Sequence, residues 1–141
     1  MTDITGQITI SSARFSEIKK LSESLAEFKK AVEQSLLEKA TQLIELVFAG
    51  SLNLNASDIH FEPEEEKTRM RLRIDGMLQD VASIDKQVYE ALLSRIKLLS
   101  GLKLNISDRP QDGRFSINID ASSIEIRSST LPAEKGEAAV L

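Results

Sequence analysis

The chain has 141 residues, the size of one domain, which is enough to bury a core without disulfides or metals. It has no cysteine and one histidine, His60, so disulfide frameworks and metal sites built from cysteine or clustered histidine are excluded, and we expect no metal ligands. The net charge of −4 argues against a nucleic-acid partner, and the absence of an 18-residue apolar run argues against a transmembrane helix.

The basic residues are unevenly distributed along the chain. Six of the 18 lie in residues 1–56 and twelve in residues 57–141. An arginine guanidinium binds phosphate or carboxylate through two parallel hydrogen bonds, which a lysine ammonium cannot do. Seven of the eight arginines fall in the second part: Arg69, Arg71, Arg73, Arg95, Arg109, Arg114 and Arg127. These arginines are therefore the first candidates for function in an acidic chain.

Residues 1–50 predict a helical N-terminal segment. Apolar residues from Phe15 to Val47 recur about every 3.6 positions, the spacing of one long amphipathic helix, with a break near Glu33–Ser35. Gly50 is suited to end this helix. Two interpretations stay open: the helix packs on its own domain, or it docks on a partner or another subunit.

Residues 51–141 are dominated by strand patterns. In residues 68–83, apolar residues alternate with arginines ahead of Asp75-Gly76, the dipeptide that a two-residue type I′ turn prefers. The alternation predicts a β-hairpin whose three arginines share one face.

Residues 86–100 have the four-and-three apolar spacing of a helix that ends at Gly101. The rest of this part predicts strands over 57–62, 114–119, 123–128 and 138–141, a loop over 103–112, and a turn marked by Pro132 and Gly136. Together the patterns predict an α+β fold, in which a long N-terminal helix is followed by a mostly antiparallel sheet with one packed helix.

Catalytic signatures are missing from the sequence. It contains no G-x-x-x-x-G-K-[ST] phosphate loop, no G-x-G-x-x-G, no G-x-S-x-G and no H-E-x-x-H. His60 lies near Asp58, and a structural hydrogen bond is a more common role for such a pair than catalysis. Glu64–Glu66 is more typical of a solvated turn than of a cation site. The sequence therefore predicts no catalytic residue.

The arginines of the predicted hairpin leave two alternatives open. The pleat of a strand places Arg69, Arg71 and Arg73 on one face at intervals of about 6.6–7 Å. In the first alternative, acidic residues pair with them on a solvated face: Glu62, Asp80 and Glu125. In the second, they form an anion site together with three further arginines: Arg109, Arg114 and Arg127. Spacing alone slightly favours the first.

Six motifs carry a resemblance to a known family. Ala56–Pro63 reads A-S-D-I-H-F-E-P and Arg71–Gly76 reads R-L-R-I-D-G. Four more follow in order: Ser94–Lys97 (S-R-I-K), Arg109–Arg114 (R-P-Q-D-G-R), Arg127–Pro132 (R-S-S-T-L-P) and Gly136-Glu137. Over residues 40–141 this series resembles the second N-terminal domain of the secretion ATPases, the motor ATPases of type II secretion and type IV pilus assembly.

The resemblance implies both a fold and a role. Residues 51–141 would form a PAS-like two-layer domain ahead of a RecA-like ATPase domain, in a homo-hexamer whose nucleotide binds between the two. The RecA-like domain of the same or the adjacent subunit would hold ATP and Mg²⁺, while this domain would bring arginines to the phosphates. The motifs make three arginines the first candidates for these contacts: Arg73, Arg114 and Arg127. Three more are candidates for nucleotide contacts or for salt bridges to the next subunit: Arg71, Arg95 and Arg109.

The chain departs from the family pattern at both ends. It stops at Leu141, before any RecA-like ATPase domain, so we expect a part of a longer motor that holds no cofactor and hydrolyses no ATP alone. Residues 1–35 match no motif of the family. By analogy with relatives, we interpret Phe15–Val32 as a docking helix for a membrane platform or adaptor protein. The expected location is cytoplasmic and peripheral at the inner membrane through these partners.

Two other functions remain as alternatives. The first is a stand-alone scaffold or regulatory module that binds a protein partner through the long helix. The second is a small-ligand sensor, against which the low aromatic content argues, since five phenylalanines and one tyrosine offer little for a pocket. The encoded sequence after Leu141 separates the motor from the stand-alone module.

Overall fold

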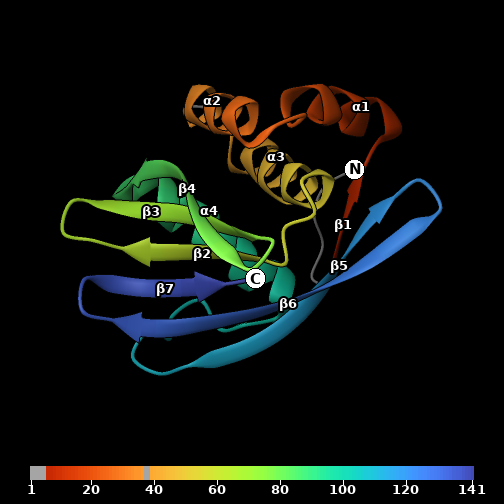
Figure 1. Ribbon diagram of the computed structural model, residues 1–141. Helices are drawn as coiled ribbons and strands as arrows, with labels where there is room; N and C mark the ends of the chain where they lie inside the picture. Colours follow the sequence, from red (N-terminus) through yellow and green to blue (C-terminus); the bar gives the residue numbers. More distant parts are fainter. Residues whose placement is uncertain (1–5, 37–38) are drawn as a thin grey trace.

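The structure, a computed structural model, describes residues 6–36 and 39–141 (Figure 1). Its helices are α1 (Ser12–Leu21), α2 (Leu25–Ser35), α3 (Ala40–Asn53) and α4 (Lys86–Ser100). Its strands are β1 (Gln7–Ile10), β2 (Asp58–Pro63), β3 (Lys67–Ile74), β4 (Met77–Asp85), β5 (Gln111–Ile119), β6 (Ser122–Ala133) and β7 (Gly136–Val140). Residues 1–5 and 37–38, which the predicted helical segment includes, lie outside the described residues.

The seven strands form one open sheet in the order β1-β5-β6-β7-β2-β3-β4. The β1–β5 pair is parallel and every other pair is antiparallel. The hairpin of β3 and β4 turns at Asp75 and Gly76, whose φ angles of 53° and 80° are those of a type I′ turn. The α+β class, the mostly antiparallel sheet, the hairpin and helix α4 are confirmed.

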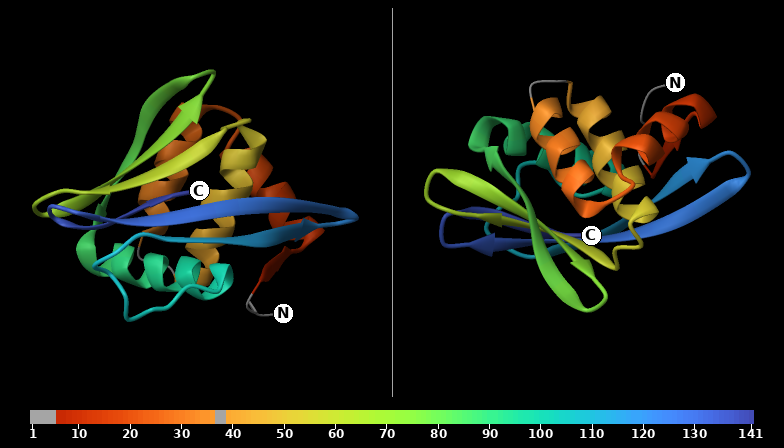
Figure 2. Two further views of the ribbon diagram at one scale, coloured as in Figure 1. Left: turned by 90° about the horizontal axis from the view of Figure 1, so that it is seen from below. Right: turned by 45° about the horizontal axis from the view of Figure 1, so that its top comes forward.

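The four helices of the described residues pack on one face of the sheet (Figures 1 and 2). Buried side chains from both parts of the chain share the core between them. The rings of Phe48 on α3 and Phe115 on β5 lie 5.4 Å apart, and those of Phe61 on β2 and Tyr89 on α4 lie 5.6 Å apart. We call the opposite side of the sheet the open face. It carries the outward residues of β2, β3, β5 and β6, among them Asp58, Arg73, Arg114, Glu125 and Arg127.

The prediction of one long N-terminal helix is wrong. The segment forms strand β1 and three helices, α1, α2 and α3. The first break lies at Ser22–Ser24, where the Ser24 side chain accepts a hydrogen bond from the Glu27 backbone N–H at 3.2 Å and so caps α2. The second follows Ser35, where the sequence predicts it. The apolar period continues across the breaks because each short helix turns its apolar side onto the same core.

The segment Phe15–Val32 is not a single helix. This segment spans parts of α1 and α2, with the turn between them. Its apolar residues Ile18, Phe28 and Val32 are fully buried, so they are not available to a partner. Of the two interpretations of the amphipathic pattern, the structure therefore supports packing on the chain's own domain.

The strands near the C-terminus are longer than predicted. The loop that was predicted over 103–112 ends earlier, because Gln111 already pairs with Thr130. Strand β6 continues through Pro132 and pairs with β7, which begins at Gly136. The end of each of these strands is set by its pairing with another strand, and a local sequence pattern does not reveal that pairing. Within the described residues, no helix combines the length and the apolarity needed to cross a bilayer.

Candidate functional site

The arginines of strand β3 all have carboxylate partners on the open face. The antiparallel register with β2 places Arg69, Arg71 and Arg73 opposite Glu62, His60 and Asp58. The nitrogen–oxygen distances are 3.0 Å for Arg69–Glu64, 3.5 Å for Arg71–Glu62, 3.1 Å for Arg71–Asp80 and 3.3 Å for Arg73–Asp58. The first alternative for the hairpin therefore holds for Glu62 and Asp80, but it is wrong for Glu125, which contacts other arginines.

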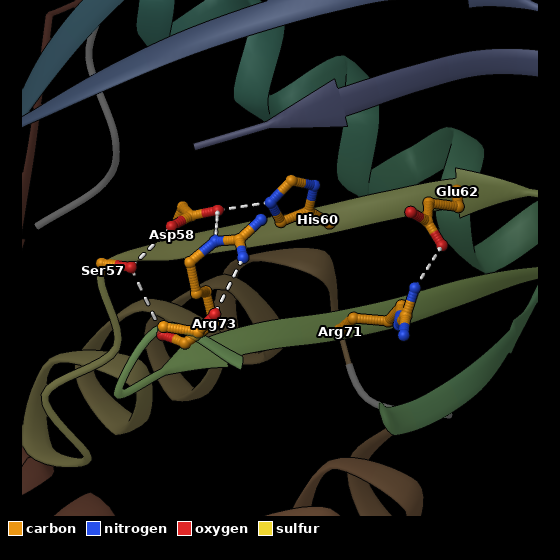
Figure 3. A network of polar contacts seen from close by, with 7 residues as sticks. Ser57, Asp58, His60, Glu62, Arg71 and Arg73 are labelled. Atoms are coloured by element: carbon orange, nitrogen blue, oxygen red, sulfur yellow. Dashed lines mark hydrogen bonds and ion pairs between the residues drawn. The ribbon is translucent and has the colours of Figure 1, made fainter. Parts of the chain in front are cut away.

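Asp58 is the centre of a polar network at the start of β2 (Figure 3). Its carboxylate accepts a hydrogen bond from the Ser57 hydroxyl at 2.6 Å and from Arg73 Nε at 3.3 Å, and it also contacts His60 Nε2. Arg73 also donates to the Gly76 carbonyl at 3.2 Å, which ties it to the hairpin turn. Burial would raise the pKa of Asp58, but the contacts with Ser57, His60 and Arg73 outweigh it and lower that pKa. Arg73 is thus held by internal partners.

Replacing Asp58 with asparagine is expected to destabilise the chain by about 1–3 kcal/mol at pH 7, since Ser57, His60 and Arg73 lose their carboxylate partner. The folded-state pKa lies below the unfolded one, so this stabilisation is present above pH ~4 and is lost as the pH falls below it. Urea unfolding from pH 7 to pH 3 should therefore show the deficit of Asp58→Asn shrinking. A deficit that stays constant, or an equal one in the exposed control Asp108→Asn, would contradict this account.

Arg114 and Arg127 form a pair on the open face. They are directly opposite each other on β5 and β6, and their side chains are 74% and 84% exposed, against 27–40% for the three arginines of β3. Like charges directly opposite in a sheet repel unless a counterion lies between them. Glu125 is that counterion, with its carboxylate 3.6 Å from Arg114 and 3.7 Å from Arg127.

Two cavities adjoin this arginine pair. One, of about 530 Å³, is lined by both arginines and by residues that include Asp112 and Ser129. The Ser129 hydroxyl donates a hydrogen bond to the Asp112 carboxylate at 2.6 Å, so this acid has a neutral partner rather than an arginine in that contact. The other, of about 260 Å³, lies where β7 ends and is lined by Arg127, Glu125, Asp58 and neighbouring residues. Arg127 therefore lines both cavities, one together with Arg114 and the other together with Asp58.

The six candidate arginines do not form one cluster. The structure brings Arg114 and Arg127 together, whereas Arg73 lies on β3, with β7 and β2 between β3 and β6 in the sheet order. Arg95 belongs to the helical layer, where it contacts the Thr41 hydroxyl on α3. Arg109 lies in the loop before β5 with its side chain 67% exposed, and its Nε is 3.4 Å from Asp108. The described residues therefore do not bring the arginines of the suggested anion site together in one place.

A buried ion pair that was not predicted from the sequence joins α4 and β7. Lys97 Nζ lies 2.6 Å from a Glu137 carboxylate oxygen, with the side chains 3% and 6% exposed. Lys97 also donates to the Ile106 carbonyl at 2.8 Å, and the Tyr89 hydroxyl donates to the Glu137 backbone carbonyl at 2.6 Å. Burial and the nearby Glu137 charge raise the pKa of Tyr89. The sequence contained one sign of this ion pair. Lys97 follows the buried Leu93 by four residues, which places a charged side chain on the inward side of α4.

A metal site does not arise from the described residues, among which no group of three or more histidine, aspartate and glutamate side chains is arranged to hold an ion. Two charged groups of the described residues bear on function: the open-face arginines with their carboxylates, and the buried Lys97–Glu137 pair. The arginine pair on β5 and β6 is the part that a ligand or partner can reach directly.

Comparisons with known proteins agree with the motifs. The chain is 39% identical over 102 residues to the Type II secretion system protein E of Xanthomonas campestris, covering 71% of this chain and 18% of the relative. It is 38% identical over 122 residues to the Putative type II secretion system protein E of Escherichia coli, covering 84% and 25%. It is 41% identical over 110 residues to a Protein transport protein HofB homolog of Haemophilus influenzae, covering 77% and 24%.

The region of similarity includes the motifs and the open-face arginines. Residues 33–141 match the family described as Type II/IV secretion system protein. The chain spans a quarter or less of the length of the three relatives described above. The chain belongs to the type II/IV secretion system ATPase family, and the resemblance carried by its motifs is confirmed.

Proposed function

We propose that this chain is a non-catalytic N-terminal domain of a hexameric secretion or pilus motor, and that it supplies arginines to nucleotide phosphates. The nucleotide and Mg²⁺ would be held by a RecA-like ATPase domain of the same or the adjacent subunit. Family membership supports the assignment to a motor. The strand order β3-β2-β7-β6-β5, with α4 between β4 and β5 in the chain, supports the PAS-like part of the proposal.

The observation that carries the proposal is the exposed pair of Arg114 and Arg127 on adjacent strands. Cβ atoms of directly opposite residues in an antiparallel pair lie about 5 Å apart, so both guanidinium groups can contact the oxygens of one phosphate group. Arg73 is less available because Asp58 and the Gly76 carbonyl already hold it. The contacts therefore favour Arg114 and Arg127 over Arg73 as the phosphate arginines.

The chemistry of this role is electrostatic. In phosphoryl transfer, negative charge spreads over the oxygens of the transferred group, and an arginine placed there stabilises the transition state. This domain would not hold the nucleotide itself, so it could supply such an arginine only when the RecA-like domain that holds the nucleotide is closed against it. Arg114 and Arg127 would thus couple hydrolysis to the relative position of two domains.

The remaining candidates suit contacts between subunits. Arg109 is exposed in the loop before β5, and Arg71 lies on the open face with two carboxylates, so each can exchange an internal ion pair for one across an interface. Contacts to a membrane platform or adaptor on the cytoplasmic side would use exposed residues of α1 and α2, such as Leu21, rather than their buried apolar side.

The experiment that tests the motor assignment compares the isolated chain with the complete encoded protein. The chain has no phosphate loop, so purified residues 1–141 should show no ATP turnover, while the complete protein should hydrolyse ATP with Mg²⁺. Both would be assayed by phosphate release against a mock purification. Mg²⁺-dependent hydrolysis by the chain alone, or a complete protein without hydrolysis, would refute the proposal.

A further inference from the structure

Glu125 has an unusual position among the open-face acids, because it serves two arginines at once. Its carboxylate lies within 3.7 Å of both Arg114 and Arg127. It precedes Arg127 by two residues on β6, which places both side chains on the same face of the strand. Its side chain is 49% exposed, so the carboxylate can turn away into solvent without any change of the backbone.

The charges at the arginine pair cancel while Glu125 stays in place. Beside Arg114 and Arg127 lie two carboxylates: Glu125, which contacts both arginines and lines the 260 Å³ cavity, and Asp112, which lines the 530 Å³ cavity. Asp112 accepts its hydrogen bond from the Ser129 hydroxyl, whereas Glu125 is paired with both guanidinium groups. An incoming anion that contacts both guanidinium groups therefore competes with Glu125 for them.

We infer that Glu125 is an internal counterion that selects for multiply charged phosphates at the Arg114–Arg127 pair. This inference rests on the proposed function and adds a ligand class to it. Because Glu125 belongs to the same chain, its carboxylate competes with an incoming anion for the two arginines at a high effective concentration. A monoanion that replaces it exchanges one negative charge for another and gains little. A terminal phosphate of a nucleoside di- or triphosphate brings about two charges and several acceptor oxygens, so it displaces the carboxylate.

The test is a titration of the isotope-labelled chain by NMR at constant ionic strength. Tripolyphosphate is the multiply charged probe and dimethyl phosphate is the monoanionic one. Wild type should bind tripolyphosphate and show no saturable shift with dimethyl phosphate. Glu125→Gln should bind tripolyphosphate about fivefold to tenfold more tightly and should gain measurable binding of dimethyl phosphate.

Asp112→Asn is the matched control, because it removes the same charge near the same arginine pair without removing an arginine partner. Its gain in tripolyphosphate affinity should stay within about twofold. Equal gains in Glu125→Gln and Asp112→Asn would overturn the inference, since Glu125 would then act only through long-range charge. Weaker binding by Glu125→Gln would also overturn it, since Glu125 would then position the arginines.

A double variant ties the effect to the arginines. The gain from Glu125→Gln should disappear in the Arg127→Ala background, and a gain that persists there would overturn the inference. Absence of binding in both wild type and Glu125→Gln would overturn it as well. The proposed function is decided separately, by the ATPase rates of Arg127→Ala and Arg114→Ala in the complete motor, so a failure of the inference can be told apart from a failure of the proposed function.

Discussion

Arg127→Ala in the complete motor is expected to lower kcat for ATP by about 10²–10³-fold, the loss typical of removing one donor to the developing charge of a transition state. Arg127 belongs to the exposed pair and lines both of the cavities that adjoin it. Because its side chain is 84% exposed, the folding of the chain should not change. Steady-state phosphate release gives the rate, and urea unfolding of the isolated chain gives the stability.

The control for this result is Arg69→Ala. Arg69 also lies on the open face and also has a carboxylate partner, Glu64 at 3.0 Å, but it is on β3 and away from the arginine pair. Its replacement should leave kcat within about twofold. A loss in Arg69→Ala as large as that in Arg127→Ala, or unfolding of Arg127→Ala that accounts for its lost rate, would contradict the assignment.

Lys97→Met is expected to destabilise the chain by about 3–5 kcal/mol, the usual consequence of leaving one member of a buried ion pair without its partner. The Glu137 carboxylate would be the unpaired group. One of its oxygens already has no hydrogen-bond partner among the described residues, so the loss of Lys97 leaves little to stabilise its charge. The free energy of unfolding, measured in urea at pH 7, would report the change.

Two further variants make this result specific. Lys97→Met combined with Glu137→Leu should recover most of the lost stability, because an apolar pair of similar volume needs no counterion. Lys103→Met removes an exposed lysine of the loop after α4 and should change the free energy of unfolding by less than about 0.5 kcal/mol. If Lys97→Met were as stable as Lys103→Met, the ion pair would have no structural role.

The parts of the fold that local chemistry determines could be predicted from the sequence. Asp75-Gly76 identified the hairpin, and Gly101 marked the end of α4, where it adopts a φ of 72°. The N-terminal segment could not be read locally, because an unbroken 3.6-residue period concealed the break at Ser22–Ser24. Strand β1 was missed because its four residues gain their partner only from β5, more than 100 positions later.

The candidate site was predictable by residue type but not by arrangement. The motifs pointed to Arg114 and Arg127, but only the β5–β6 register shows that they lie opposite each other. Glu125 was assigned to the wrong arginines for the same reason, since the pairing of distant strands decides which charges meet. Lys97 belongs to the motif Ser94–Lys97, which pointed to the family but not to a buried ion pair. The one local sign of this ion pair was a charged residue on the inward side of α4.

The most direct test of the central claim is a structure of the complete motor with a non-hydrolysable ATP analogue and Mg²⁺. The account predicts that a guanidinium nitrogen of Arg114 or Arg127 lies about 3 Å from a phosphate oxygen, with the Glu125 carboxylate turned away from both. A nucleotide whose phosphates lie beyond hydrogen-bonding reach of both arginines, with Glu125 still between them, would contradict it.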